Sequence, residues 1–202
     1  ILERIMDTVE GLVDRIIIGA PESYLSTFIQ IAGKRAEVLT GGDTRQETVY
    51  KLFRKTSAEL ILVHDVSWPF VSARVFEDVL LCASESGAAS AVTGINVPLG
   101  RYENGRIREY LPKENCCLSQ TPQAYSREVL RDSFTIAIKE GIEFQSLAQL
   151  VTFSGHGIDA VFVKEPGIKI TYPLDMEIAT RVIAPGSDVS KGSGKRGLQE
   201  PL

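Results

Sequence analysis

Short runs of β-branched and other apolar residues alternate along this chain with stretches whose apolar residues recur at helical spacing. The predicted strands cover residues 15–21, 36–40, 59–64 and 88–95, and the predicted helices cover residues 1–12, 22–32, 44–55 and 73–86. A helix between successive strands is typical of parallel sheets, which carry helices on both faces and have apolar strands. The alternation predicts an α/β fold with a mostly parallel sheet.

The pattern changes between residues 97 and 118. Glu103-Asn-Gly105 is a hairpin turn signal between two segments of alternating polar and apolar residues, so we predict a protruding β-arm of two strands. A two-stranded arm with polar faces is only marginally stable by itself. We therefore expect the arm to lie against a partner subunit or across a site.

The alternation resumes beyond the arm. Helices are expected at residues 126–139, 145–153 and 173–183, and strands at residues 159–164 and 168–171. No linker interrupts residues 1–184, so we predict one domain there. The glycine, serine and lysine content of residues 185–202 predicts a disordered tail.

Composition excludes several classes of protein. With 202 residues, a net charge of −4 and a pI near 5.3, the chain is long enough for one substantial core and too acidic to bind nucleic acid through a broad basic surface. Its apolar runs are far shorter than the ~20 residues that span a bilayer, and no secretory signal pattern is present, so we expect a cytoplasmic protein without a membrane segment. Cys82, Cys116 and Cys117 lack the spacing of a zinc site.

Ligands of open α/β sheets bind beyond the carboxyl ends of the strands, so polar residues just after each predicted strand are the first candidates for a site. Gly41-Gly42-Asp43-Thr44 follows one strand; its glycines allow a ligand close to the backbone, and the following helix N-terminus favours anions. The alternative is a plain turn in which Asp43 or Thr44 caps the helix. Asp65 follows the next strand and can hold a metal or a substrate hydroxyl, or simply start a turn.

Two more segments carry candidate residues. Ser119–Tyr125 is an extended polar run whose amides and hydroxyls can contact a ligand. Gly167–Thr171 places Lys169 on the face opposite to its apolar neighbours, where its ammonium either neutralises a phosphate or faces solvent at a sheet edge. His64 is expected to be a packed residue rather than a catalytic base, because no nucleophile motif accompanies it.

In this order, the four segments resemble one family of enzymes. G-G-D-T-R-Q-E-T-V (41–49), L-V-H-D-V-S-W-P-F (62–70), Q-T-P-Q-A-Y (120–125) and G-I-K-I-T-Y-P-L-D (167–175) are similar to motifs of the 2-C-methyl-D-erythritol 4-phosphate cytidylyltransferase family and its ribitol 5-phosphate relatives. The resemblance extends from Ile1 to about Ile183. It implies a Rossmann-like nucleotide-binding sheet and an arm used to form a homodimer.

The resemblance also implies an activity. Members condense CTP with a polyol phosphate in a pathway to isoprenoid precursors, releasing pyrophosphate, with Mg²⁺ assisting. In-line phosphoryl transfer of this kind needs positioning and charge neutralisation rather than a covalent nucleophile. No residue is assigned to the metal. The implied roles are nucleotide binding by Gly41, Gly42, Asp43, Arg45 and Thr48, substrate binding by Asp65, Thr121, Lys113 and Trp68, and catalysis by Lys169.

Three departures from the family pattern concern the pocket for the acceptor. Trp68 occupies the position of an arginine that contacts the substrate phosphate, Asn96-Val97 replaces an Asp-Thr pair, and Lys113 replaces an arginine. The first two changes remove a charge, and lysine keeps the charge but lacks the bidentate fork of arginine. The acceptor pocket is therefore altered more than the nucleotide pocket.

The start of the chain differs as well. Members of the family begin with a strand and a glycine-rich loop whose arginine and lysine surround the CTP triphosphate. The sequence opens at Ile1 in a helical pattern and contains no such loop, which we expect either from truncation or from a natural loss.

Two functional interpretations remain open. The first is a cytidylyltransferase acting on 2-C-methyl-D-erythritol 4-phosphate, with ribitol 5-phosphate as the alternative acceptor. The second is a degenerate, non-catalytic homologue that binds a nucleotide or a partner protein, since the loop supplies charges that stabilise the transition state. A generic dinucleotide-binding protein is disfavoured because G-x-G-x-x-G is absent.

Overall fold

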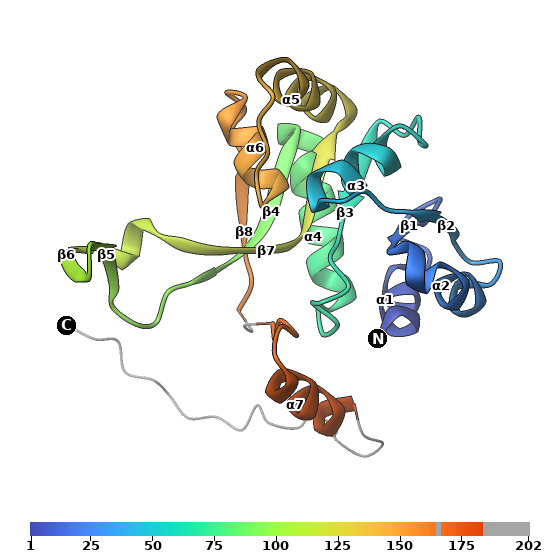
Figure 1. Cartoon of the computed structure of the whole chain (residues 1–202), viewed down its shortest axis with the longest axis horizontal. Coiled ribbons are helices and arrows are strands. Elements are labelled where there is room, and N and C mark those ends of the chain that lie inside the picture. The colour runs from blue at the N-terminus through green and yellow to red at the C-terminus, as the bar shows by residue number, and fades with distance from the viewer. Residues whose placement is uncertain (165–166, 184–202) are drawn as a thin grey trace.

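A four-stranded sheet in the order β3-β7-β4-β8 forms the centre of the computed structural model, which describes residues 1–164 and 167–183 (Figure 1). β7 is antiparallel to both of its neighbours, whereas β4 and β8 are parallel, so β3, β4 and β8 all run in one direction. The predicted α/β fold with a mostly parallel sheet is confirmed, with β7 as the reversed strand. The bounds are β3 (Leu60–Val63), β7 (Cys117–Ser126), β4 (Ala88–Gly94) and β8 (Asp159–Phe162).

The sequence pattern does not predict β7, because its polar residues and proline are unusual in a central strand. Gln120, Thr121 and Gln123 are nevertheless buried. Gln120 Nε2 donates a hydrogen bond to Thr93 Oγ1 at 3.1 Å, and Tyr125 Oη donates to Gln123 Oε1 at 2.9 Å. These hydrogen bonds satisfy the buried polar side chains, which allows a polar strand to occupy the middle of the sheet.

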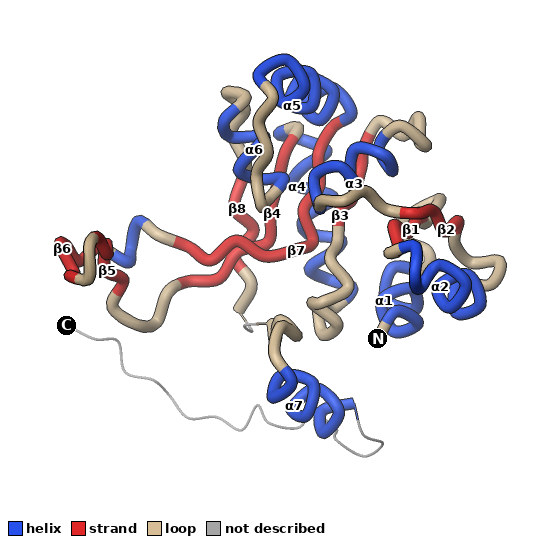
Figure 2. Tube along the Cα trace, in the orientation of Figure 1, coloured by secondary structure: helices blue, strands red, loops and turns tan. Residues whose placement is uncertain are grey.

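Helices cover both faces of the sheet (Figure 2). α4 packs on one face, and α3, α5 and α6 pack on the other. Because both faces are covered, β4 is buried over nearly its whole length, whereas the edge strand β8 stays largely exposed. The helices are α1 (Leu2–Val9), α2 (Leu25–Ala32), α3 (Arg45–Phe53), α4 (Ala73–Ser86), α5 (Arg127–Glu140), α6 (Leu147–Phe153) and α7 (Pro173–Ile183).

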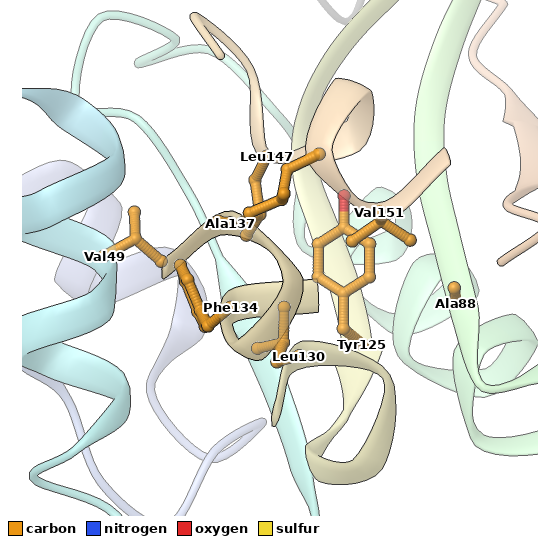
Figure 3. Close-up of a cluster of buried hydrophobic side chains, with 9 residues drawn as sticks. Val49, Ala88, Tyr125, Leu130, Phe134, Ala137, Leu147 and Val151 are labelled. Carbon is orange, nitrogen blue, oxygen red and sulfur yellow. The ribbon is translucent and has the colours of Figure 1, made fainter. Parts of the chain in front are cut away.

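Neighbouring residues of β7 point to opposite faces, as alternate residues of a strand must. Ala124 packs in the cluster that contains Val79 of α4. Tyr125 packs in the other cluster, with Leu130 and Phe134 of α5 (Figure 3). The strand that carries Thr121 is therefore fixed from both sides of the sheet.

The N-terminal strands β1 (Ile17–Ala20) and β2 (Glu37–Thr40) form a separate parallel pair. Among the described residues, neither strand is hydrogen-bonded to β3. A cleft of about 910 Å³ lies between β1 and β3, and apolar side chains of α1, β1, α3, β3 and α4 make most of its lining. Arg45, Thr48 and Asp65 also line it, so this cleft joins the predicted nucleotide and substrate segments.

The predicted β-arm is confirmed as the hairpin of β5 (Leu99–Glu103) and β6 (Arg106–Leu111), which projects away from the central sheet (Figure 1). Asn104 and Gly105 form its turn with φ angles of 49° and 78°. Asparagine and glycine are the residues that most readily adopt positive φ, so the turn follows from the local sequence.

One predicted strand is wrong. Residues 168–171 do not join the sheet, and the segment is attached to the loop after β3 by a hydrogen bond from Ile170 N to Ser67 O at 2.8 Å. A strand in a sheet needs a series of backbone hydrogen bonds to a neighbouring strand, and a single bond to a loop does not provide it. The predicted tail at 185–202 lies outside the described residues. No helix in residues 1–164 and 167–183 is long and apolar enough to cross a membrane.

Candidate active site

The side chain of Thr48 holds the loop between β2 and α3 in shape. Its hydroxyl accepts a hydrogen bond from Gly42 N at 2.8 Å and donates one to Thr44 O at 2.9 Å. A Cβ on Gly41 would lie 2.9 Å from this hydroxyl, and a Cβ on Gly42 would lie 2.5 Å from the Glu47 side chain. The two glycines are required because the loop lies tightly against the first turn of α3.

The N-terminus of α3 is capped by its own residues. Thr44 Oγ1 accepts from Glu47 N at 3.1 Å, and Glu47 Oε2 accepts from Asp43 N at 2.8 Å. Lys51 and the backbone N–H of Asp43 lower the pKa of the Glu47 carboxyl through these contacts. The alternative in which Thr44 caps the helix is therefore confirmed. Glu47 was not among the predicted residues, although Thr44-x-x-Glu47 is the spacing of a capping box.

The backbone N–H groups of Gly41, Gly42 and Asp43 donate hydrogen bonds within the protein. Gly41 N donates to Ala20 O at 2.8 Å, Gly42 N donates to the Thr48 hydroxyl, and Asp43 N donates to the Glu47 carboxylate. These three N–H groups therefore have protein partners, while the expectation that the N-terminus of α3 favours an anionic group stays a prediction. What the loop offers to a ligand is hydrogen-bond acceptors, including the exposed carboxylate of Asp43.

Arg45, Asp65 and Thr121 meet at the carboxyl end of β3. Arg45 Nε lies 3.0 Å and Nη2 lies 2.9 Å from Asp65 Oδ1, and Asp65 N donates to Thr121 Oγ1 at 3.1 Å. The side chains of the ion pair are 29% and 33% exposed, so the pair contributes on the order of 1 kcal/mol or less to stability. Its main consequence is geometric, because the planar guanidinium fixes the direction of the carboxylate.

His64 supports the loop that carries Asp65. The imidazole packs edge-on against Phe76 with ring centroids 4.8 Å apart, and its Nε2 lies 3.0 Å from Trp68 O. Burial lowers the pKa of His64 to about 4, so the ring is neutral at pH 7. A carbonyl only accepts, hence Nε2 carries the proton. His64 is thus a packed residue, as expected, and not a base.

The segment that carries Lys169 lies against the same loop. Ile170 is bonded to Ser67 through the backbone, and Gly167 lies against the indole ring of Trp68. The side chain of Lys169 is exposed. Although the predicted strand is absent, the fold brings Lys169 to the loop that also carries Asp65 and Trp68.

Comparison with known proteins assigns the family. A family model described as 2-C-methyl-D-erythritol 4-phosphate cytidylyltransferase matches residues 1–184. The chain belongs to the 2-C-methyl-D-erythritol 4-phosphate cytidylyltransferase family. A cytidylyltransferase of that name from Thermus thermophilus is 37% identical over 147 residues, which cover 73% of this chain and 69% of the relative. Another from Aquifex aeolicus is 25% identical over 182 residues, covering 90% of this chain and 82% of the relative.

Solved structures of cytidylyltransferases share the fold. The crystal structure of the Thermus thermophilus enzyme superposes with a TM-score of 0.79 at 32% identity, over 90% of this chain and 87% of the other. A synthase structure from Anaerococcus prevotii has a TM-score of 0.82 at 20% identity, covering 89% of this chain and 84% of the other, and supports the fold alone. The resemblance inferred from the four motifs is confirmed.

Lys113, a predicted substrate-binding residue, does not lie with the other predicted site residues in the structure. It lies in the short 3₁₀ helix Lys113–Asn115 between the arm and β7, and it is exposed. Its side chain makes no hydrogen bond or ion pair within the described parts of the chain. Its role in substrate binding stays a prediction. Because Lys113 lies beside the arm, that role depends on where the arm lies when a second copy of the chain is bound.

Gln46 is a residue of the cytidylyltransferase motif that the sequence did not single out. Its Nε2 donates to Ile142 O at 3.1 Å, and its Oε1 accepts from Phe144 N at 3.0 Å. The amide therefore attaches the start of α3 to the loop between α5 and α6. No local signal predicts this contact, because the partners are 96 and 98 residues away.

Proposed function

We propose that this chain transfers a cytidylyl group from CTP to 2-C-methyl-D-erythritol 4-phosphate. An oxygen of the acceptor phosphate attacks the α-phosphorus of CTP, the bond from that phosphorus to the bridging oxygen of the β-phosphate breaks, and pyrophosphate leaves. Family membership supports the reaction. The observation that carries the proposal is the meeting of Arg45, Asp65 and Thr121, from three separate segments, where Arg45 and Asp65 line the cleft.

The loop at 41–43 is proposed to recognise the base of CTP rather than its phosphates. Cytosine presents an exocyclic amine, which is a hydrogen-bond donor, and the loop offers acceptors while its N–H groups are internally bonded. Thr48 acts in this scheme by fixing the loop. Asp65 and Thr121 contact the polyol, and the ammonium of Lys169 neutralises phosphate charge in the transition state.

Mg²⁺ is proposed as the metal of the reaction. No group of three His, Cys, Asp or Glu side chains suited to a metal ion occurs in residues 1–164 and 167–183. Mg²⁺ does not require one, since it keeps several waters and binds one or two carboxylates together with substrate phosphates. The ion would neutralise triphosphate charge.

The arm is proposed to pair with a second copy of the chain. Three large apolar side chains on the hairpin are strongly exposed: Tyr102 at 72%, Ile107 at 59% and Tyr110 at 65%. Apolar groups gathered on a projecting element favour a partner surface. Sedimentation velocity of Ile107→Ser should then show monomer under conditions where the unaltered chain is dimeric, while Leu81→Ser, which replaces an exposed leucine of α4, should leave the dimer intact.

The deciding assay is pyrophosphate release with CTP, Mg²⁺ and one acceptor at a time, either 2-C-methyl-D-erythritol 4-phosphate or ribitol 5-phosphate. We expect release with the first, loss of release in EDTA and its return with added Mg²⁺. Asp65→Asn should abolish turnover, whereas Asp132→Asn, at an exposed ion pair on α5, should not. CTP binding by calorimetry without release from either acceptor would contradict the proposal and favour a non-catalytic binding protein.

A further inference from the structure

Hydrogen bonds hold the backbone of the loop after β3 around Trp68. Trp68 N donates to Asp65 O at 3.0 Å, and Trp68 O accepts from His64 Nε2 at 3.0 Å. Pro69 is fully buried, and its carbonyl accepts from Arg4 Nε at 3.0 Å. The indole ring therefore projects from a backbone that is held on both sides.

The ring of Trp68 lies against Gly167. A Cβ on Gly167 would lie 3.0 Å from Cε3 and 3.1 Å from Cζ3 of the indole, closer than side-chain carbons normally approach. Three residues later, Ile170 N donates to Ser67 O at 2.8 Å. Lys169 thus lies between two points at which the segment is attached to one loop.

We infer that Trp68 is a positioning residue whose indole holds residues 167–170 against the loop after β3, so that Lys169 reaches the site from the loop that carries Asp65. The inference rests on the proposed function, in which Lys169 contacts a substrate phosphate. An indole has one donor and no charge, so it cannot replace the bidentate phosphate contact of an arginine. Its apolar six-membered ring can instead pack against the bare backbone of a glycine.

This role differs from the direct substrate contact that position alone predicts for Trp68. At the position where the family has an arginine that binds the acceptor phosphate, this chain has an aromatic ring. We infer that this ring positions a different cation, Lys169. Glycine at 167 allows this close contact, because the Cβ of a larger residue would push the ring or the segment away by a few tenths of an ångström.

Fluorescence tests the contact without turnover, since Trp68 is the only tryptophan of the chain. Gly167→Ala puts a methyl group against the ring, and we expect the emission to shift to longer wavelength and quenching by acrylamide to increase. Gly157→Ala is the matched control, because a Cβ there meets nothing within 4 Å. Emission from Gly167→Ala that matches the unaltered chain would overturn the contact.

Limited proteolysis tests whether the ring holds Lys169. Trypsin can cleave after Lys169 only when the segment leaves Ser67, so the rate of this cut reports opening. Trp68→Ala should raise it on the order of tenfold, because proteolysis follows the population of the opened segment. Trp68→Phe, which keeps an aromatic face, should raise it less, and cleavage after the exposed Lys139 should not change. Equal rates of cleavage after Lys169 in all three proteins would overturn the inference.

A double-variant cycle connects the contact to the reaction. If Trp68 acts through Lys169, Trp68→Ala lowers kcat without changing KM for CTP, and Trp68→Ala with Lys169→Ala is no slower than Lys169→Ala alone. Losses that multiply would mean that Trp68 acts on the acceptor directly, against the inference. If no form of the protein releases pyrophosphate, the proposed function fails, and fluorescence and proteolysis still decide whether Trp68 holds the segment.

Discussion

Acidification should weaken this fold through His64, and the size of the effect follows from its environment. Burial against Phe76 lowers the pKa of the imidazole to about 4. In the unfolded chain, histidine titrates near pH 6.5. Between these values the unfolded state binds a proton that the folded state does not, so the free energy of unfolding falls as the pH falls.

The magnitude can be worked out from the two pKa values. The contribution of His64 is fully present above about pH 6.5 and is lost at about 1.4 kcal/mol per pH unit down to about pH 4, about 3 kcal/mol in total. Between about pH 7.5 and about pH 5 the expected loss is about 2 kcal/mol. Protonation would also place a charge in the loop that carries Asp65 and Trp68.

Urea unfolding followed by circular dichroism at both pH values measures this loss. His64→Gln cannot titrate, yet its amide can still donate to Trp68 O, so its free energy of unfolding should fall by about 2 kcal/mol less than that of the unaltered chain. His156→Gln, which removes the other histidine, serves as the matched control. A pH dependence in His64→Gln as steep as in the unaltered chain would refute the assignment of the effect to His64.

Three other substitutions test the site and the core. Thr48→Val leaves Gly42 N without its partner, so we expect the free energy of unfolding in urea to fall by about 1–2 kcal/mol and the KM for CTP to rise. Thr48→Ser keeps the hydroxyl and should show neither effect. An unchanged KM in Thr48→Val would show that the shape of the loop does not matter for CTP binding. Arg45→Ala should lower kcat/KM by at least about tenfold while changing the free energy of unfolding by no more than about 1 kcal/mol, and a parallel loss of stability would contradict a role in the site. Leu130 is fully buried in α5, so Leu130→Ala should lower the free energy of unfolding by about 2–5 kcal/mol. Leu81 is exposed, so Leu81→Ala should lower it by about 0.5 kcal/mol or less, and urea denaturation curves of both variants measure the difference.

The sequence by itself determined the local elements of this protein. The α4 and α7 helices begin and end where apolar spacing and end signals predict, and the hairpin turns at Asn104 and Gly105. Such features depend on residues only a few positions apart, so a linear pattern contains them. The order of four short motifs was also enough to indicate the family, and two of them follow the ends of β2 and β3, where ligands of such sheets bind.

Only the tertiary structure decided how these motifs meet. Thr121 lies 56 residues from Asp65, and β7 becomes a central strand because its polar side chains bond to one another and to Thr93 once they are buried. The segment at 168–171 has a strand-like sequence, yet its backbone partner is a loop. The low pKa of His64 and the contact of Trp68 with Gly167 arise from neighbours distant in sequence. Desolvation, charge pairing and close packing depend on distance in space, which the path of the folded chain sets and no local pattern records.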